Sequence, residues 1–199
     1  MMYRGHALLG LAVAESSAAA TSMSAVHALV WIPVATLCSL WPDLDGAGAR
    51  LAKLLPPITT ILSWLTRKLA KHAFLRSKTP MDTGEVRIHR GLSHTPVYIL
   101  VCSAVLWGSL ASSTNLALLV SLAFLVGNLA HLLGDAFSLS GLPLLWPIRV
   151  KGKRWFDVKA PEFMRFRVGA EVETAILTPL MFVLALLGAI WYVKTLIGG

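Results

Sequence analysis

The stretch "NLALLVSLAFLVGNLAHLLGDAF", residues 115–137, is apolar for most of its length and carries His131 and Asp135 near its end. An α-helix rises about 1.5 Å per residue, so about 20 residues cross the roughly 30 Å hydrocarbon core of a bilayer. The stretch therefore predicts a membrane-spanning helix. Because His131 and Asp135 are four residues apart, they lie on one face of that helix.

The composition of the whole chain agrees with a membrane protein. Hydrophobic residues make up 56% and charged residues 14%, whereas ordinary soluble domains carry about 25% charged residues. A length of 199 residues suits one compact domain. We therefore predict an all-α fold, a polytopic transmembrane helical bundle in which residues 1–199 form a single integral membrane domain.

Four more apolar segments accompany this helix. In chain order, the five predicted spans cover residues 7–20, 23–41, 96–111, 115–137 and 174–197, which leaves long loops at 42–95 and 138–173. The second, fourth and fifth are long enough to cross a bilayer, whereas the short first and third would need a thinned or protein-shielded membrane. A polar hairpin at 112–115 joins the third span to the fourth.

The first segment also fits another class of sequence. Arg4, the apolar run 7–14 and the small residues at 16–20 are typical of a secretory signal peptide with a cleavage site. Against that interpretation stands His6, which opens the segment and belongs with the polar residues described below.

The basic residues predict the orientation. Of the 18 Lys and Arg residues, nine lie between Arg50 and Arg90 and seven between Arg149 and Arg167, while the turns at 15–24 and 111–115 contain none. By the positive-inside rule, both basic loops face the cytoplasm. Five spans with a cytoplasmic N terminus satisfy this rule, which predicts an integral protein of the inner (plasma) membrane.

The net charge of +8 does not require nucleic acid as a partner, because a basic cytoplasmic face attracts anionic lipid headgroups, at about 1 kcal/mol for each Lys or Arg near the surface. Residues 54–78 set apolar side chains at roughly helical spacing among basic ones, which favours an amphipathic helix in the membrane interface. The apolar positions are Ile58, Ile61, Leu62, Leu65, Leu69 and Phe74, and the basic ones are Arg67, Lys68, Lys71 and Arg76. A solvated basic loop is the alternative.

Ionisable residues gather where the predicted spans meet the cytoplasm. "WPDLDG", 41–46, ends the second span with two carboxylates on a turn, from which both can converge on one cation. "HRGLSH", 89–94, places two histidines before the third span. With the residues that open the first and fifth spans, the candidate site comprises His6, Asp43, Asp45, His89, His94, His131, Asp135 and Glu173.

This set of side chains predicts a divalent-metal site. Imidazole and carboxylate ligands together suit Zn²⁺ first, with Mn²⁺ or Mg²⁺ as alternatives. Ionisable groups at the edge of a span are costly and mark a site, a pathway or an ion pair. Each group also has a purely structural explanation: helix caps for Asp43 and Asp45, a mutual hydrogen bond for His131 and Asp135, and a lipid headgroup for Arg90. Convergence from five sequence positions favours the metal.

Five motifs give the chain a resemblance to a known family. They are "YRGHALLG" (3–10), "LWPDLDG" (40–46), "HRGLSHTP" (89–96), "GNLAHLLGDAFSLSGLPLLWPI" (127–148) and "RFRVGAEVE" (165–173). In this order, over nearly the whole chain, they resemble the YdjM-type membrane-bound metal-dependent hydrolases. The resemblance implies a multi-span membrane protein with a divalent-metal site at the histidines and aspartates above. It also implies Arg90 and Trp146 beside that site, and Glu173 or its neighbour Glu171 as a late acidic position.

Two classes of function remain open. In the first, a bound metal lowers the pKa of its water and polarises a phosphoryl or acyl oxygen, while Asp45 or Asp135 takes a proton and Arg90 holds developing negative charge. A site at headgroup level then predicts a lipid phosphoester as substrate. In the second class, the same residues bind or transport a cation without chemistry. Transporter sites usually lie near the bilayer midplane between repeats, so the position at one edge favours hydrolysis.

Overall fold

A computed structural model describes all residues except 47–52, 54–55, 84–85, 87, 111–113 and 199. Its main helices are α1 (Tyr3–Ala20), α2 (Ala25–Cys38), α3 (Ile58–Ser77), α4 (Pro96–Ser109), α5 (Thr114–Ala136) and α6 (Thr178–Gly198). Shorter turns are η1 (Pro42–Asp45), η3 (Leu92–His94), η4 (Glu162–Met164) and the π-helical η5 (Val172–Leu177). Within the described ranges only isolated β-bridges occur, so the all-α prediction is confirmed.

Among the described residues, three helical stretches are long and apolar enough to cross a membrane: Ala25–Asp45, Asn115–Ala136 and Val172–Gly198. They coincide with the second, fourth and fifth predicted spans. The third span is the shorter apolar helix α4, and the first is α1, which begins four residues before the predicted start. The predicted hairpin at 112–115 lies partly outside the described residues, and the count of five spans stays a prediction.

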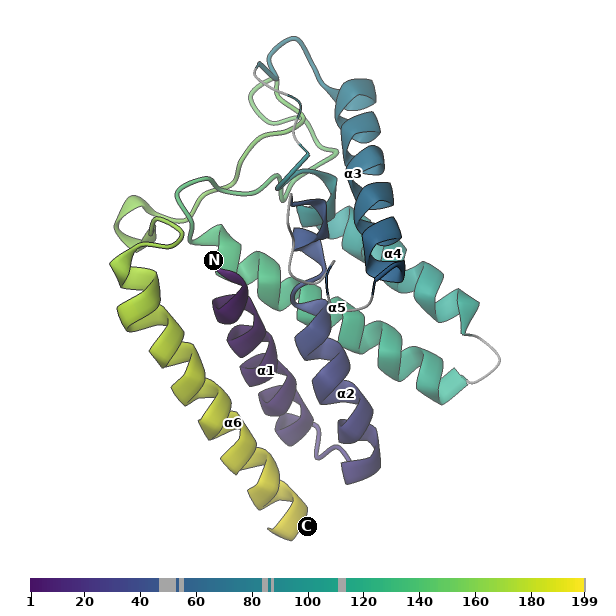
Figure 1. Ribbon diagram of the computed structural model, residues 1–199, viewed down its shortest axis with the longest axis vertical. Coiled ribbons are helices and arrows are strands. Elements are labelled where there is room, and N and C mark those ends of the chain that lie inside the picture. Colours follow the sequence, from purple (N-terminus) through teal and green to yellow (C-terminus); the bar gives the residue numbers. More distant parts are fainter. Residues whose placement is uncertain (47–52, 54–55, 84–85, 87, 111–113, 199) are drawn as a thin grey trace.

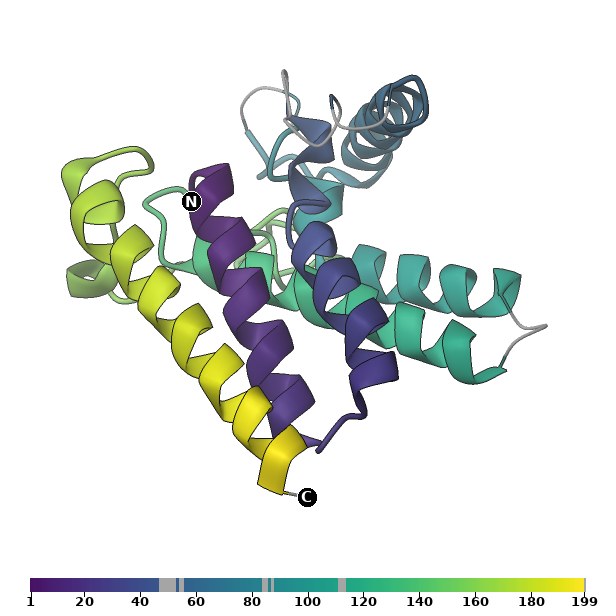
Figure 2. The ribbon, with the colours of Figure 1, turned by 60° about the horizontal axis from the view of Figure 1, so that its bottom comes forward.

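Helix α1 is the centre of the arrangement. It packs against α6, α2 and α5, while α4 lies along α5 (Figures 1 and 2). Small residues permit these close approaches, as in many membrane helix pairs. A Cβ added at Gly10 of α1 would lie 2.4 Å from Ser39 Oγ, and one at Gly127 of α5 would lie 2.1 Å from the carbonyl oxygen of Ala35. The bundle therefore brings α1, α2 and α5 together at one level.

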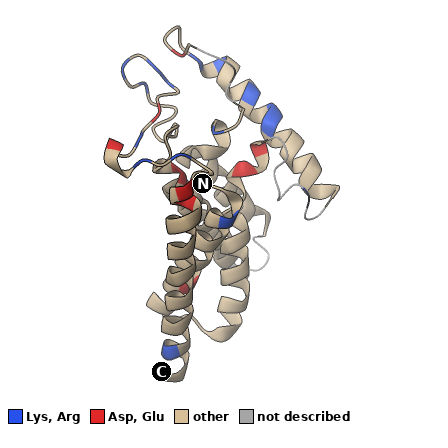
Figure 3. Cartoon of the chain, turned by 60° about the vertical axis from the view of Figure 1, so that its left-hand side comes forward, with Lys and Arg blue, Asp and Glu red and all other residues tan. Residues whose placement is uncertain are grey.

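Charged residues are unevenly distributed over the molecule. They gather at the end that carries α3 and the loops, whereas the opposite ends of the helices carry few (Figure 3). Both basic loops thus lie at the same end of the bundle, as the positive-inside rule requires of loops that share one side of a membrane. The N terminus lies at this end and the C terminus at the other (Figure 1).

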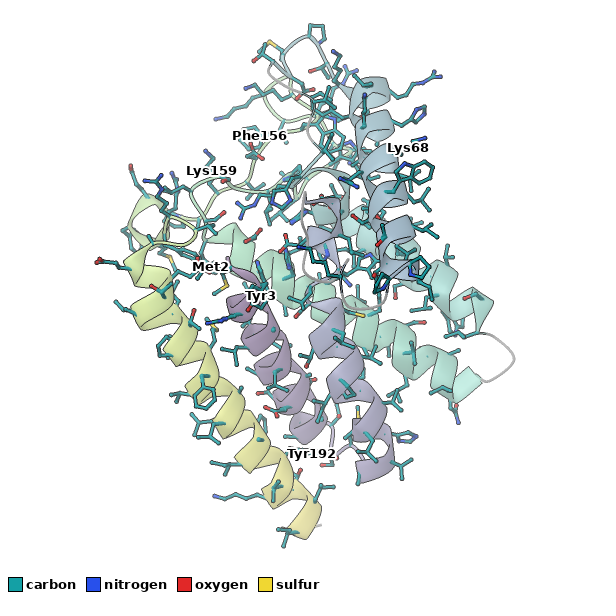
Figure 4. All side chains as sticks on the ribbon, in the orientation of Figure 1. Met2, Tyr3, Lys68, Phe156, Lys159 and Tyr192 are labelled. Atoms are coloured by element: carbon teal, nitrogen blue, oxygen red, sulfur yellow. The ribbon has the colours of Figure 1, made fainter. Side chains whose placement is uncertain are left out.

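Helix α3 covers most of the predicted amphipathic segment, residues 54–78, and lies outside the bundle. Its inner face carries small polar side chains, and the Ser63 hydroxyl donates to the Leu44 carbonyl at 2.6 Å. Lys68 points outward, with its Nζ 4.1 Å from the centroid of the Trp64 ring (Figure 4). The outer face is apolar at Ile58, Ile61, Leu65 and Leu69. Phe74 was wrongly assigned to this face, because it is buried against Trp155.

Candidate metal centre

The last two turns of α5 contribute His131 and Asp135, both almost fully buried. The Nδ1 atom of His131 lies 2.7 Å from the carbonyl oxygen of Ser39. A carbonyl only accepts hydrogen bonds, so Nδ1 carries the proton and Nε2 of the neutral ring is left with a free lone pair. This backbone contact orients His131 as a metal ligand, in the way that outer partners fix ligating histidines elsewhere.

His6 reaches the same place from the first turns of α1. Its ring stacks on that of His131, with centroids 3.7 Å apart and planes 14° from parallel, and its Nε2 lies 3.3 Å from Oδ1 of Asp135. The Ser39 hydroxyl donates to the His6 carbonyl at 2.9 Å and so fixes this part of α1 against α2. In the part of the chain that the structure describes, Nδ1 of the buried His6 has no hydrogen-bond partner.

The two carboxylates of η1 point in different directions. Oδ1 of Asp43 lies 3.7 Å from Nε2 of both His94 and His131, whereas Oδ2 of Asp45 lies 3.5 Å from Nδ1 on the far side of the His94 ring. Asp43 belongs to a group of described side chains that could hold a metal ion and Asp45 does not, so the convergence of both on one cation stays a prediction. A 3₁₀ turn has about three residues per turn, which separates side chains two residues apart by about 240°.

His94 ends η3 and is buried at the middle of the cluster. Its Nε2 lies 3.2 Å from Nε2 of His131, and the Ser93 hydroxyl bonds both to Asp45 and to Nδ1 of His94. Burial lowers the pKa of His94, but the carboxylates of Asp43 and Asp45 outweigh it and raise that pKa to about 9. The two carboxylates therefore favour the protonated form of His94.

His89 and Arg90, the first two residues of "HRGLSH", lie at the rim of the cluster. His89 is 52% exposed, and its Nδ1 lies 2.7 Å from Oδ1 of Asp45. Arg90 has a backbone φ of 56°, a left-handed conformation that is unusual for a side chain of this size. Its guanidinium donates to the Ser138 hydroxyl at 2.6 Å and lies 3.0 Å from Oδ2 of Asp135. The strained backbone turns Arg90 inward over the cluster.

Within the described part of the chain, two overlapping groups of side chains could hold a metal ion: His6, His131 and Asp135, and Asp43, His94 and His131. In each group the ligand atoms lie within 4.8 Å of one another. Because Nδ1 of His131 is occupied by the Ser39 carbonyl, both groups depend on the single lone pair at Nε2. One imidazole nitrogen binds one ion, so the two groups are two sides of one site.

A model of the YdjM inner membrane protein family matches residues 1–197. The chain belongs to this family. The Inner membrane protein YdjM of Escherichia coli (strain K12) and that of Shigella flexneri are each 25% identical to it over 152 residues, which cover 75% of this chain and 67% of theirs. No solved structure matches the chain. Family membership and the three apolar helices make this an integral inner membrane protein.

Not every residue predicted for the site lies within the cluster of this YdjM family member. The buried carboxylate of Glu173 accepts hydrogen bonds from the backbone N–H groups of Met2 and Gly169, and it is absent from both groups among the described residues. Glu171 is exposed. Trp146 lies away from the cluster, donating to the Ser77 hydroxyl and packing against Trp155. Glu173 therefore links the N-terminal segment to the start of η5.

Three serines of this YdjM family member were not predicted as part of the site. Ser39 supplies the carbonyl that fixes His131, Ser93 connects Asp45 to His94, and Ser138 accepts from Arg90. Ser93 and Ser138 lie within the motifs that carry the family resemblance, and Ser39 immediately precedes one of them. Their positions beside ligand candidates were the only signal in the sequence.

Proposed function

We propose that the cluster binds one divalent metal ion, Zn²⁺ first, with Mn²⁺ or Mg²⁺ as alternatives. The observation that carries this proposal is the fully buried His6: its Nδ1 has no hydrogen-bond partner among the described residues, and its Nε2 lies 3.3 Å from the Asp135 carboxylate. A buried polar atom without a partner usually costs about 1–3 kcal/mol. A cation shared by His6, His131 and Asp135 would supply that partner. Imidazole nitrogen and carboxylate oxygen form a donor set typical of zinc.

The proposed topology has five spans in a single membrane domain, with the N terminus in the cytoplasm. It is supported by the two basic loops, which lie at the same end of the bundle as the cluster (Figure 3). Cysteine introduced at Lys78 or Lys153 should then be shielded from an impermeant thiol reagent in intact cells, and cysteine at Thr21 should react. Cys38 and Cys102 are removed first. Labelling at Lys78 from outside the cell would contradict this orientation.

The chemistry that we propose is hydrolysis of a lipid phosphoester at the cytoplasmic headgroup level. A divalent ion bound there would lower the pKa of a bound water and polarise a phosphoryl oxygen. Arg90 stands beside Asp135 with its guanidinium turned over the cluster, where it can hold a phosphate oxygen. Anionic headgroups are then both partners of the basic face and the source of the substrate. Nucleic acid is not expected as a partner.

Protons leave the proposed site through Asp45 and His89. Asp45 is buried behind His94, and its other oxygen meets His89, which is half exposed. A proton accepted at Asp45 can therefore pass to the imidazole of His89, which is half exposed, and from there to water. Asp135 is the second candidate base, but its Oδ2 already lies 3.0 Å from the guanidinium of Arg90.

The experiment has two stages. Purified protein is first analysed for bound metal by elemental mass spectrometry, and then for metal-dependent release of phosphate or diacylglycerol from labelled phospholipids. We expect about one ion per chain and turnover that chelation abolishes. Protein that binds the ion without any turnover would instead be a metal-binding or cation-transporting membrane protein, which is the second candidate function. Protein without bound metal, even after incubation with Zn²⁺, Mn²⁺ or Mg²⁺, would refute both.

A further inference from the structure

An apolar cavity of about 340 Å³ lies beside the metal centre. Its walls come from α1, α5, η4, the segment after η4 and the start of the last span. They include Leu9, Leu133, Phe137, Phe166, Leu177 and Met181. Small-molecule sites usually have volumes of about 300–1,000 Å³ and mostly apolar walls. The cavity is thus large enough for part of a ligand, and its walls select an apolar one.

One end of the cavity touches the metal centre. Gly134 lines the cavity and immediately precedes Asp135. A Cβ added at Gly134 would lie 2.7 Å from Met1 Sδ and 3.4 Å from His6 Nδ1. Gly134, with the side chains of Met1 and Leu9 beside it, therefore separates the cavity from His6. A molecule in the cavity would have one end at the ligands.

The other end of the cavity opens at the side of the bundle. Leu133 and Met164 line it and are 52% and 44% exposed. In the proposed topology this opening lies where α5 and α6 enter the membrane, so a lipid tail can reach it without crossing water. Three of the lining residues are methionines: Met1, Met164 and Met181. Unbranched thioether side chains adapt to ligands of different shape and length.

We propose that this cavity holds one acyl chain of a membrane phospholipid whose phosphate lies at the metal centre. This inference rests on the proposed function and specifies its substrate: a lipid recognised by both its headgroup and one chain. The juxtaposition supplies both halves of that recognition, because Arg90 and the cluster face an anion while the adjoining cavity offers apolar walls alone. A detergent molecule or a helix of a second copy would use only the apolar half.

The experiment labels the cavity directly and needs no turnover. The full-length protein is placed in nanodiscs of phosphatidylethanolamine and phosphatidylglycerol that contain a small fraction of phosphatidylglycerol with a diazirine on one acyl chain. After illumination, labelled peptides are mapped by mass spectrometry. We expect label to concentrate on residues 133–137, 164–166 and 177–181, above the level on the lipid-exposed remainder of α6.

Filling the cavity provides the matched comparison. Met181→Trp places an indole in the cavity and should reduce label at residues 133–137 by about tenfold, whereas Leu180→Trp is the control, because Leu180 is exposed and does not line the cavity. Met164→Trp fills the same cavity from a partly exposed position, so the comparison survives if Met181→Trp does not fold. Bound metal is measured in every variant and should equal that of the wild type.

The outcomes separate this inference from the proposed function. Label spread evenly over the exposed apolar surface, or unchanged in both cavity variants, would overturn the acyl chain even if the protein hydrolyses phospholipid. Cross-links between two copies at these residues would assign the cavity to a helix of a second copy, and label lost to detergent but not to added phospholipid would assign it to detergent. Cavity-confined label in a protein without turnover would support the acyl chain and refute hydrolysis.

Discussion

Asp135 and Asp82 are both carboxylates at the charged end of the molecule, yet their surroundings differ in kind. The Asp82 oxygens accept hydrogen bonds from the backbone N–H groups of Thr79, Trp155 and Arg154 at 2.7, 3.1 and 3.2 Å. Asp135 instead contacts the terminal ammonium group of Met1, the ring of His6 and the guanidinium of Arg90. One carboxylate is bonded by fixed backbone donors, and the other lies among groups that can exchange partners.

The difference indicates which of the two carboxylates is placed to bind a metal ion. Backbone N–H groups carry no lone pair, so they satisfy Asp82 but cannot help it to bind a cation. Imidazoles can donate a proton or, when neutral, offer a lone pair to a metal. Asp135 therefore lies among potential co-ligands, whereas Asp82 links residues 79–82 to residues 154–155. Glu173 belongs with Asp82 on this criterion, although it is as buried as Asp135.

The largest effect is expected for Asp135→Asn, which preserves shape and removes the charge. We expect metal affinity to fall by more than about 100-fold, beyond the range of 10 to 100-fold that loss of an outer partner usually costs. Equilibrium dialysis with the preferred ion measures this affinity. Glu171→Gln is the control, because it removes a carboxylate that is exposed. Wild-type metal content in Asp135→Asn would make Asp135 a helix-end residue without part in the site.

The histidines of "HRGLSH" sharpen the same comparison within one motif. His94 lies inside a metal-binding group and His89 outside both. His94→Ala should therefore nearly abolish metal binding, whereas His89→Ala should retain one ion per chain and slow turnover by about 100 to 10,000-fold, as loss of a general acid–base group does. Metal content and turnover are measured on both variants. Equal metal loss in the two would reject the division that the structure makes between them.

Asp45→Asn tests a carboxylate that contacts imidazoles, as Asp135 does, but lies on the Nδ1 side of His94, away from Nε2. Asp45 bonds to Ser93 and His89 and lies beside Nδ1 of His94. Its replacement should lower metal affinity by about 10 to 100-fold, as is usual when a ligating histidine loses the partner that orients it. Binding isotherms of Asp45→Asn and Asp43→Asn are compared. A larger loss for Asp45→Asn would indicate that Asp45 ligates the ion directly.

Most of the fold could be predicted from the sequence, because the signals are local. Length and hydropathy identified the three long spans, and the mixture of apolar and basic residues identified α3. Phe74 was misassigned because an apolar residue on an amphipathic helix fits either the protein or the membrane. Its burial depends on Trp155, which is 81 positions later in the chain.

The sequence predicted that the histidine and aspartate motifs lie at one end of the bundle, but not how their side chains are arranged there. The spacing of His131 and Asp135 placed both on one face of α5, and the topology brought the other motifs to the same end. Which nitrogen of His131 is free depends on a backbone carbonyl 92 residues away. Likewise, the role of Glu173 depends on N–H groups of Met2 and Gly169. Neither contact can be predicted from the residue types, because both involve backbone groups.

The smallest effect is expected for Asp82→Asn, which tests the other side of the comparison. Burial raises the pKa of Asp82, but hydrogen bonds from Thr79, Trp155 and Arg154 outweigh it and lower that pKa below its ordinary value. A lowered pKa means that Asp82 stabilises the fold above the ordinary aspartate pKa of about 4, and that this contribution is lost as the pH falls further. At neutral pH the variant should unfold about 2–4 °C lower, as expected for about 1 kcal/mol in a chain of this length.

The difference in Tm between Asp82→Asn and the wild type should shrink below about pH 4, as Asp82 becomes neutral in the wild type too. Thermal unfolding of both proteins at several pH values, with metal analysis alongside, measures this. Because its partners are backbone donors, metal content should stay unchanged, and metal loss in Asp82→Asn would show that the loops around it support the metal centre after all.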